Sequence, residues 1–234
     1  MIRSALLLAV ACTAFAPCGR AAPVGATGDT VTIARLVSAT PVRLHPRPTS
    51  RLLATIAPVR PLTRQQTALP VVDARNDQTG ERWLRVRLPG RPNGRTGWIR
   101  AGSARLASSP WRVVVIRSRR EAVLLRNGRI VERLRVVIGK PATPTPRGHF
   151  FVVEHVPQPN GSPLGRWALA TSAHSNVLQE FDGGPGQIAL HGRRGPLAID
   201  PLGTAASHGC VRLDSAAVER LSRLLPNGTP IEIR

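Results

Sequence analysis

Two short stretches decide the fold of this chain: residues 187–192 (QIALHG) and residues 207–212 (SHGCVR). The first is an apolar, strand-like run that ends at His191, and the second carries His208 and Cys210. Two histidines and a cysteine therefore lie within 20 residues of one another. A thiol must be deprotonated before it can attack a carbonyl, and a neighbouring imidazole can accept that proton and, as imidazolium, stabilise the thiolate. The spacing predicts a cysteine nucleophile, Cys210, served by His191.

The residues around Cys210 favour the same chemistry. Gly209 lets the backbone approach a substrate closely and can direct N–H groups toward an oxyanion. Arg212 brings a positive charge that can lower the thiol pKa or bind a carboxylate. Three alternatives remain open: a zinc site of Cys210, His208 and His191, a buried inert cysteine, and a papain-like peptidase, although in that class the cysteine precedes its histidine.

The N-terminus has the layout of a secretory signal. A basic start at Arg3 precedes an apolar run over residues 5–16 and small residues up to Ala26, so we expect a signal peptide over residues 1–26. The competing interpretation is a lipoprotein signal at Cys12 or Cys18. Removal of residues 1–26 would leave Cys210 as the single cysteine of an exported protein, which indicates a role in chemistry.

Composition excludes a disordered chain and weakens the case for a nucleic-acid partner. The 234 residues carry 33 Lys+Arg against 13 Asp+Glu, yet 42% are hydrophobic, which is enough to build a core. Lys140 is the single lysine, so much of the charge reflects an arginine bias. No aromatic-rich nucleic-acid signature is present, and we expect affinity for an anionic cell-wall surface instead.

We expect a mainly β chain in two domains. Residues 27–107 form a small β domain with a barrel-like fold, in which the strands at 83–88 and 98–100 and the turn between them resemble bacterial Src-homology-3-like domains. Residues 103–110 read as a short linker of small residues. Residues 108–234 form a β-sandwich-type domain with a hairpin at Asn127-Gly128 and one late helix that is capped by Asp214 and ends before Pro226.

The spacing of His191 and the SHGC run resembles the signature of the L,D-transpeptidase (YkuD-type) catalytic domain. Residues 137–150 (VIGKPATPTPRGHF) and 227–231 (NGTPI) resemble other stretches of that family, and the likeness covers about residues 111–234. Arg212 stands where many members carry asparagine. A sortase-like transpeptidase also places histidine before cysteine, but the SHG lead-in fits it less well.

The resemblance implies an exported peptidoglycan cross-linking enzyme, in the periplasm or cell wall, that needs no metal or organic cofactor. Its partners would be peptidoglycan stem peptides, and carbapenems would inhibit it. Cys210 would attack the third residue of a stem tetrapeptide and release D-alanine, and His191 would transfer the proton. The remaining site residues would be His208, Gly209 and the Cys210 N–H at the oxyanion hole, Ser207 orienting an imidazole, Gly192 at the substrate, and Arg212 on the stem carboxylates.

Three further expectations concern residues outside these motifs. His174 is expected in a loop that could form a lid over the site. His45, His149 and His155 are not expected to take part. The pair Arg193-Arg194 is either solvated or in contact with substrate carboxylates. The rival functions are a catalytically idle wall-binding protein, which the intact His191 and Cys210 disfavour, and a nucleic-acid binder.

Overall fold

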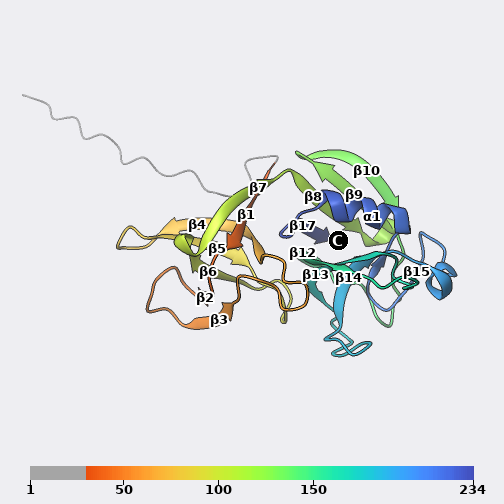
Figure 1. Ribbon diagram of the computed structural model, residues 1–234, viewed down its shortest axis with the longest axis horizontal. Helices are drawn as coiled ribbons and strands as arrows, with labels where there is room; N and C mark the ends of the chain where they lie inside the picture. The colour runs from red at the N-terminus through yellow and green to blue at the C-terminus, as the bar shows by residue number, and fades with distance from the viewer. Residues whose placement is uncertain (1–29) are drawn as a thin grey trace, which may run out of the picture.

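A computed structural model describes residues 30–234 and shows two β units side by side (Figure 1). The chain passes from one unit to the other at residue 110, between β7 and β8. The expected signal peptide and Cys12 and Cys18 lie outside the described residues. The mainly β class is confirmed, and the described chain contains one α-helix. Within residues 30–234, no helix is long and apolar enough to cross a membrane.

The N-terminal unit, residues 31–109, is a seven-stranded sheet in the order β3-β2-β6-β5-β4-β1-β7. Its strands alternate, as Leu84 and Val86 of β5 illustrate: both are buried in one core, while Arg85 between them is exposed. Its resemblance to a Src-homology-3-like barrel stays a prediction. The strands are β1 (Val31–Leu36), β2 (Thr40–Arg43), β3 (Leu52–Ile56), β4 (Ala68–Asn76), β5 (Arg82–Arg87), β6 (Thr96–Arg100) and β7 (Ala104–Ser109).

The expected linker at residues 103–110 is wrong. Ala104–Ser109 forms β7, which pairs with β1 over its whole length, from Leu36 opposite Ala104 to Val31 opposite Ser109. Its small and polar residues suit an edge strand, whose outer face is solvated. The predicted domain boundary between residues 107 and 108 falls inside this strand, and the division into domains stays a prediction.

The C-terminal unit, residues 111–234, is built on an eight-stranded sheet in the order β10-β9-β8-β17-β12-β13-β14-β16. The Asn127-Gly128 turn is confirmed: both residues have positive φ, and they join β9 to β10 as a two-residue hairpin requires. The C-terminal strand inserts between β8 and β12 and closes the sheet. The strands are β8 (Trp111–Ile116), β9 (Glu121–Arg126), β10 (Arg129–Arg135), β11 (Ile138–Gly139), β12 (Gly148–Pro157), β13 (Trp167–His174), β14 (Gln187–His191), β15 (Ala205–Ser207), β16 (Val211–Arg212) and β17 (Pro230–Ile233).

The late helix is also confirmed. In α1 (Ser215–Leu224), the Asp214 carboxylate accepts a hydrogen bond from the Ala216 N–H and so caps the first turn. Val218 and Leu221 are buried against the sheet and belong to the same core as Leu190 and Val211. The helix packs against β13 and β14, and β14 carries His191.

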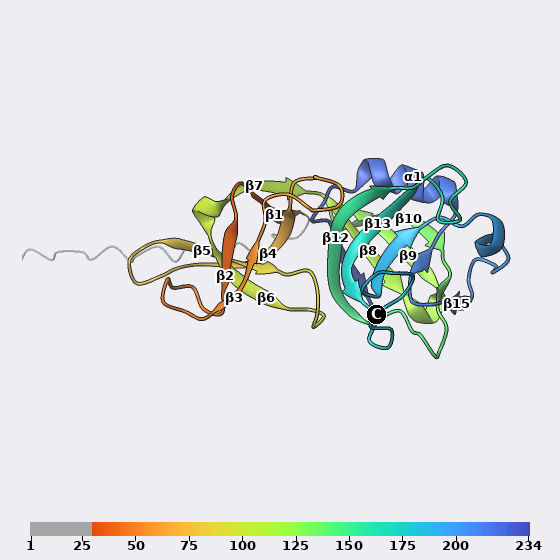
Figure 2. The same cartoon turned by 60° about the horizontal axis from the view of Figure 1, so that its bottom comes forward.

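Strand β12 has two buried faces and belongs to two cores. Phe150 and Val152 point into the core of the C-terminal unit, and Phe151 and Val153 complete the core of the N-terminal unit. Figure 2 places β12 at the boundary between the two units. The core of the N-terminal unit is thus shared with the C-terminal unit.

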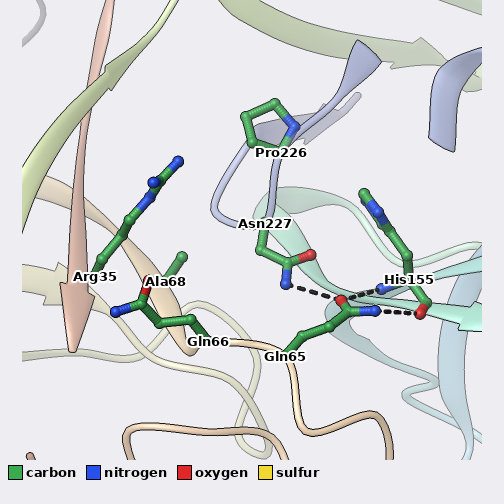
Figure 3. A pocket seen from close by; sticks show the side chains of 7 residues that line it. All are labelled: Arg35, Gln65, Gln66, Ala68, His155, Pro226 and Asn227. Carbon is green, nitrogen blue, oxygen red and sulfur yellow. Dashed lines mark hydrogen bonds between the residues drawn. The ribbon is translucent and has the colours of Figure 1, made fainter. Parts of the chain in front are cut away.

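Polar contacts extend the same boundary. The Gln65 side chain bonds both backbone groups of His155: its Nε2 donates to the carbonyl at 2.7 Å, and its Oε1 accepts from the N–H at 3.0 Å. Asn227 also donates to Gln65 Oε1 (Figure 3). The nearly buried carboxylate of Glu154 accepts from Thr63 at 2.7 Å and pairs with Arg60. These contacts hold the two units in a defined orientation.

Candidate active site

The pairing of β14 with β16 brings the two decisive stretches together. The strands run parallel, with Leu190 beside Val211 and His191 beside Arg212. Leu190 and Val211 point into the core, so the alternation of a strand places His191 and Arg212 on the opposite face. Cys210 immediately precedes β16, and its Sγ accepts a hydrogen bond from the Ala189 N–H at 3.4 Å. The predicted nucleophile therefore lies just before β16, beside the strand that carries the predicted base.

One pocket of about 480 Å³ receives these side chains. Its wall includes Cys210, His191, His208 and Arg212, together with Ala189 of β14. The segment between β13 and β14, residues 175–186, forms another wall, and we call it the flap. The sequence-predicted Ser207, Gly209 and Gly192 support this pocket from behind instead of lining it.

His191 is held as a neutral base. Its side chain is 4% exposed, and Nδ1 lies 2.7 Å from the Gly192 carbonyl oxygen. A carbonyl can only accept, so Nδ1 carries the proton and Nε2 keeps its lone pair. The pKa of His191 is lowered to about 4, chiefly by burial and also by the Arg212 charge, against the opposing effect of the Gly192 bond.

Cys210 is held as a neutral thiol. Burial raises the pKa of the Cys210 thiol, while the Ala189 N–H and the Arg212 charge act in the opposite direction. Among residues 30–234, no hydrogen bond joins Cys210 Sγ to the His191 ring. The resting site therefore holds a thiol and an imidazole, both uncharged.

The SHGC turn is shaped by backbone hydrogen bonds. The Ser207 hydroxyl donates to the Cys210 carbonyl at 2.7 Å and accepts from the Gly209 N–H at 3.1 Å, so it braces the turn. The expectation that Ser207 orients an imidazole is wrong. Gly209 has φ of +123°, and a Cβ there would lie 2.9 Å from Ile188 Cδ1. Only glycine fits this position without strain.

These bonds also decide which N–H groups are available. Because the Gly209 N–H is taken by Ser207, it does not serve an oxyanion in this conformation. The Cys210 N–H makes no hydrogen bond to any of the described residues. Of the N–H groups of Gly209 and Cys210, the one that remains available to an oxyanion is therefore that of Cys210.

Arg212 is buried and paired with an acid that the sequence analysis missed. Its side chain is 8% exposed, Nη1 donates to Asp200 Oδ2 at 2.6 Å, and Nε is buried without a partner among the described residues. Asp200 is the single acidic residue between His191 and Ser207, and this position could have identified it in the sequence as a partner for Arg212. Because Arg212 also lines the pocket, its guanidinium brings a positive charge to the wall that holds Cys210.

Thr145 is the second supporting residue that the sequence analysis did not single out. Its fully buried hydroxyl donates to the Gly209 carbonyl at 2.7 Å and accepts from the Gly139 N–H at 2.9 Å. It therefore ties the turn before Cys210 to β11. The TPTP run of residues 143–146 marks this segment in the sequence, but it does not indicate that Thr145 contacts Gly209.

His208 lies at the rim of the pocket. Its imidazole is exposed, stacks on Phe181 of the flap with ring centroids 5.1 Å apart, and has Lys140 Nζ 3.4 Å from Nε2. Its position suits contact with a bound molecule more than proton transfer at Cys210. Gly192 is packed so tightly that a Cβ would lie 2.7 Å from Ser215 Oγ, and it contributes the carbonyl that orients His191.

The remaining candidates lie apart from the chemistry. His174 is the last residue of β13 and is buried, so the expectation of a lid-loop histidine is wrong, although the flap begins at the next residue. Arg193 donates to the carbonyls of Ala198 and Asp200 and thereby braces its own loop. Among residues 30–234, no three His, Cys, Asp or Glu side chains lie close enough to hold a metal ion, the set of Cys210, His191 and His208 included.

Comparison with known proteins supports the resemblance seen in the sequence. The YkuD proteins of Bacillus licheniformis and Bacillus subtilis are 32% and 28% identical to this chain over 124 residues, which is 53% of this chain. The match spans 66% of the length of each of these relatives, just under two thirds.

Solved structures of L,D-transpeptidases also match. One from Mycobacterium smegmatis has a TM-score of 0.43 at 19% identity and covers 87% of this chain and 99% of its own. L,D-transpeptidase 3 from Mycobacterium tuberculosis has a TM-score of 0.47 at 14% identity and covers 72% of this chain and 91% of its own.

The family model of the L,D-transpeptidase catalytic domain, YkuD, matches residues 110–233, the C-terminal unit almost from end to end. It includes both stretches that β14 and β16 bring together. The chain belongs to the L,D-transpeptidase (YkuD) catalytic-domain family.

Proposed function

We propose that this chain is an exported peptidoglycan L,D-transpeptidase that works through a thioester on Cys210. The observation that carries the proposal is the placement of a thiol, a tautomer-fixed neutral imidazole and a buried arginine on one wall of one pocket. Family membership supports the reaction class. The substrates, the roles of the residues and the location of the protein are proposals.

In the first half-reaction, Cys210 attacks the carbonyl of the third residue of a stem tetrapeptide. The Sγ–H proton moves to Nε2 of His191 as the C–S bond forms, and the Cys210 N–H stabilises the oxyanion. The C–N bond to the terminal D-alanine then breaks, and His191 returns its proton to the leaving amine. A thioester and free D-alanine result.

In the second half-reaction, an amine of another stem attacks the thioester. His191 Nε2 takes a proton from the amine, the new C–N bond forms as the C–S bond breaks, and the thiolate recovers a proton from His191. The uncharged Cys210 thiol and His191 imidazole suit this cycle, because in each half-reaction the same nitrogen, His191 Nε2, takes up a proton and then releases it. The product is a cross-link between two stems.

Arg212 is the residue we assign to the stem carboxylates. Asp200 pairs with Nη1 of its guanidinium, and the guanidinium charge lies at the wall of the pocket, where it can attract an anionic group. His208 and Phe181, stacked at the rim, would flank the peptide chain. We further propose that the protein acts in the periplasm or cell wall, that the N-terminal unit is a Src-homology-3-like domain, and that the arginine-rich surface favours an anionic wall.

A carbapenem provides the test, because its strained lactam carbonyl acylates a reactive thiol and leaves the product attached. Incubation of the full chain followed by peptide mass spectrometry should give one adduct, on the peptide that contains Cys210. Cys210→Ser is the matched control, since it keeps size and polarity and should lose that adduct. An adduct elsewhere, or none on a folded chain, would contradict the proposal and favour a wall-binding role without catalysis.

A further inference from the structure

The flap, residues 175–186, is largely exposed and yet contributes Leu178 and Phe181 to the pocket. Its own hydrogen bonds are few: the Ser175 N–H donates to the Gly186 carbonyl, the Ser175 hydroxyl accepts from the Val177 and Leu178 N–H groups, and Phe181 and Gly184 exchange backbone bonds. A segment with little buried surface opens readily unless something else restrains it. The position of the flap therefore depends on its contacts with other parts of the chain.

Arg91 of the N-terminal unit supplies three of these contacts. It lies in the loop between β5 and β6, residues 88–95. Its Nη2 donates to the carbonyls of Ser175 at 2.9 Å and Leu178 at 2.8 Å, and its Nε donates to Gln179 Oε1 at 3.1 Å. Charged donors bind carbonyl oxygens more strongly than neutral donors do. One guanidinium thus ties the first turn of the flap, which the Ser175 hydroxyl braces from within, to the N-terminal unit.

Asn93 of the same loop fixes the start of the flap. Its amide bonds both backbone groups of His174, accepting from the N–H at 2.9 Å and donating to the carbonyl at 2.7 Å. It also donates to Asn176 Oδ1 at 3.0 Å. The side chain therefore continues the hydrogen-bonding pattern of β13 across the boundary between the units.

The contacts of Arg91 and Asn93 also affect the other end of the flap and the rim of the pocket. Gly186 lies so close to the first turn that a Cβ there would be 2.2 Å from the Leu178 carbonyl oxygen and 3.2 Å from Arg91 Nη2. Phe181, between the two ends, stacks on His208. A shift of the first turn would therefore disturb the wall of the pocket that faces Cys210.

We propose that Arg91 and Asn93 are positioning residues through which the N-terminal unit holds the flap in the geometry that binds the donor peptide. The inference rests on the proposed function for its substrate, but the restraint of the flap is independent of any activity. It gives the N-terminal unit a part in the active site, beyond any contact with the wall.

The test combines Arg91→Ala with hydrogen exchange and steady-state kinetics on the full chain. Loss of charged hydrogen bonds should speed exchange of the flap amides by roughly tenfold and raise KM for a stem tetrapeptide by a similar factor. The kcat should change little, and so should alkylation of Cys210 by iodoacetamide, which is too small to need the flap. Arg91→Lys should restore part of the KM, and Asn93→Ala should reproduce the effect of Arg91→Ala.

Arg105→Ala is the matched control. It removes the same charge from an exposed position on β7, where the side chain makes no hydrogen bond or ion pair to the flap, and it should leave both measurements unchanged. Unchanged flap exchange and KM in Arg91→Ala would overturn the inference, and so would faster exchange spread evenly over both units. If flap exchange rises but the unaltered chain forms no thioester, the positioning role holds and the proposed function fails.

Discussion

Acid destabilisation of the fold tests the state of His191. Replacement of this histidine by glutamine, His191→Gln, keeps a polar side chain of similar length but removes the titrating group. In the folded chain the pKa of His191 is lowered to about 4, chiefly by burial, from an ordinary value of 6.5. Between these two pH values the unfolded chain binds a proton at this position and the folded chain does not, so stability falls as the pH falls from 6.5 to 4.

The magnitude follows from the same numbers. Each pH unit across this window is worth about 1.4 kcal/mol, so His191 alone should account for a loss of about 3 kcal/mol on acidification. Burial also lowers the pKa of His155 and His174, which adds to the loss in the unaltered chain. The difference between the unaltered chain and His191→Gln isolates the contribution of His191.

Urea unfolding at a series of pH values from 4 to 8 measures this difference directly. The free energy of unfolding of His191→Gln should decline less steeply with acid than that of the unaltered chain. The control is His208→Gln, which removes an exposed imidazole from the rim of the same pocket and should retain the steep decline. Parallel curves for the unaltered chain and His191→Gln would refute a buried neutral His191, and with it the neutral resting pair.

Two further predictions concern the shared core and the charge at the site. Phe151→Ala should lower the free energy of unfolding by about 3–5 kcal/mol, because Phe151 is 1% exposed in the core that the two units share. Urea unfolding followed by tryptophan fluorescence should show one shifted transition, and two separate transitions would contradict the shared core. Arg212→Gln should slow the alkylation of Cys210 by iodoacetamide at pH 8, because the Arg212 charge lowers the pKa of the thiol. An equal or faster rate, measured by mass spectrometry, would show that this charge does not act on the sulfur.

The sequence was sufficient where short-range rules or a distinctive spacing apply. Asn127-Gly128 and Asp214 carry local turn and cap chemistry, and both appear in the structure as expected. The pairing of His191 with Cys210 in one pocket followed from their spacing. The linker at residues 103–110 was wrong because β7 is stabilised by pairing with β1, a partner far away in the chain that its own composition does not reveal.

What the sequence could not supply is the set of long-range partners. Asp200 contacts Arg212 because the loop after β14 folds back over β16, and Thr145 reaches the Gly209 carbonyl from a segment 64 residues away. The resting protonation state of the site could not be read from the motif either, since it follows from burial, which raises the pKa of Cys210 and lowers that of His191. Burial is a property of the packed chain and not of a motif.

The central claim is that Cys210 accepts an acyl group from a stem peptide and passes it to an amine. The most direct measurement incubates the full chain with purified stem tetrapeptide and follows D-alanine release, the protein thioester and the cross-linked product by mass spectrometry. We expect equal amounts of D-alanine and of acyl transferred, a thioester on Cys210, and none of these with Cys210→Ser. Cross-linked product from Cys210→Ser, or no D-alanine from a folded chain whose Cys210 is readily alkylated, would contradict it.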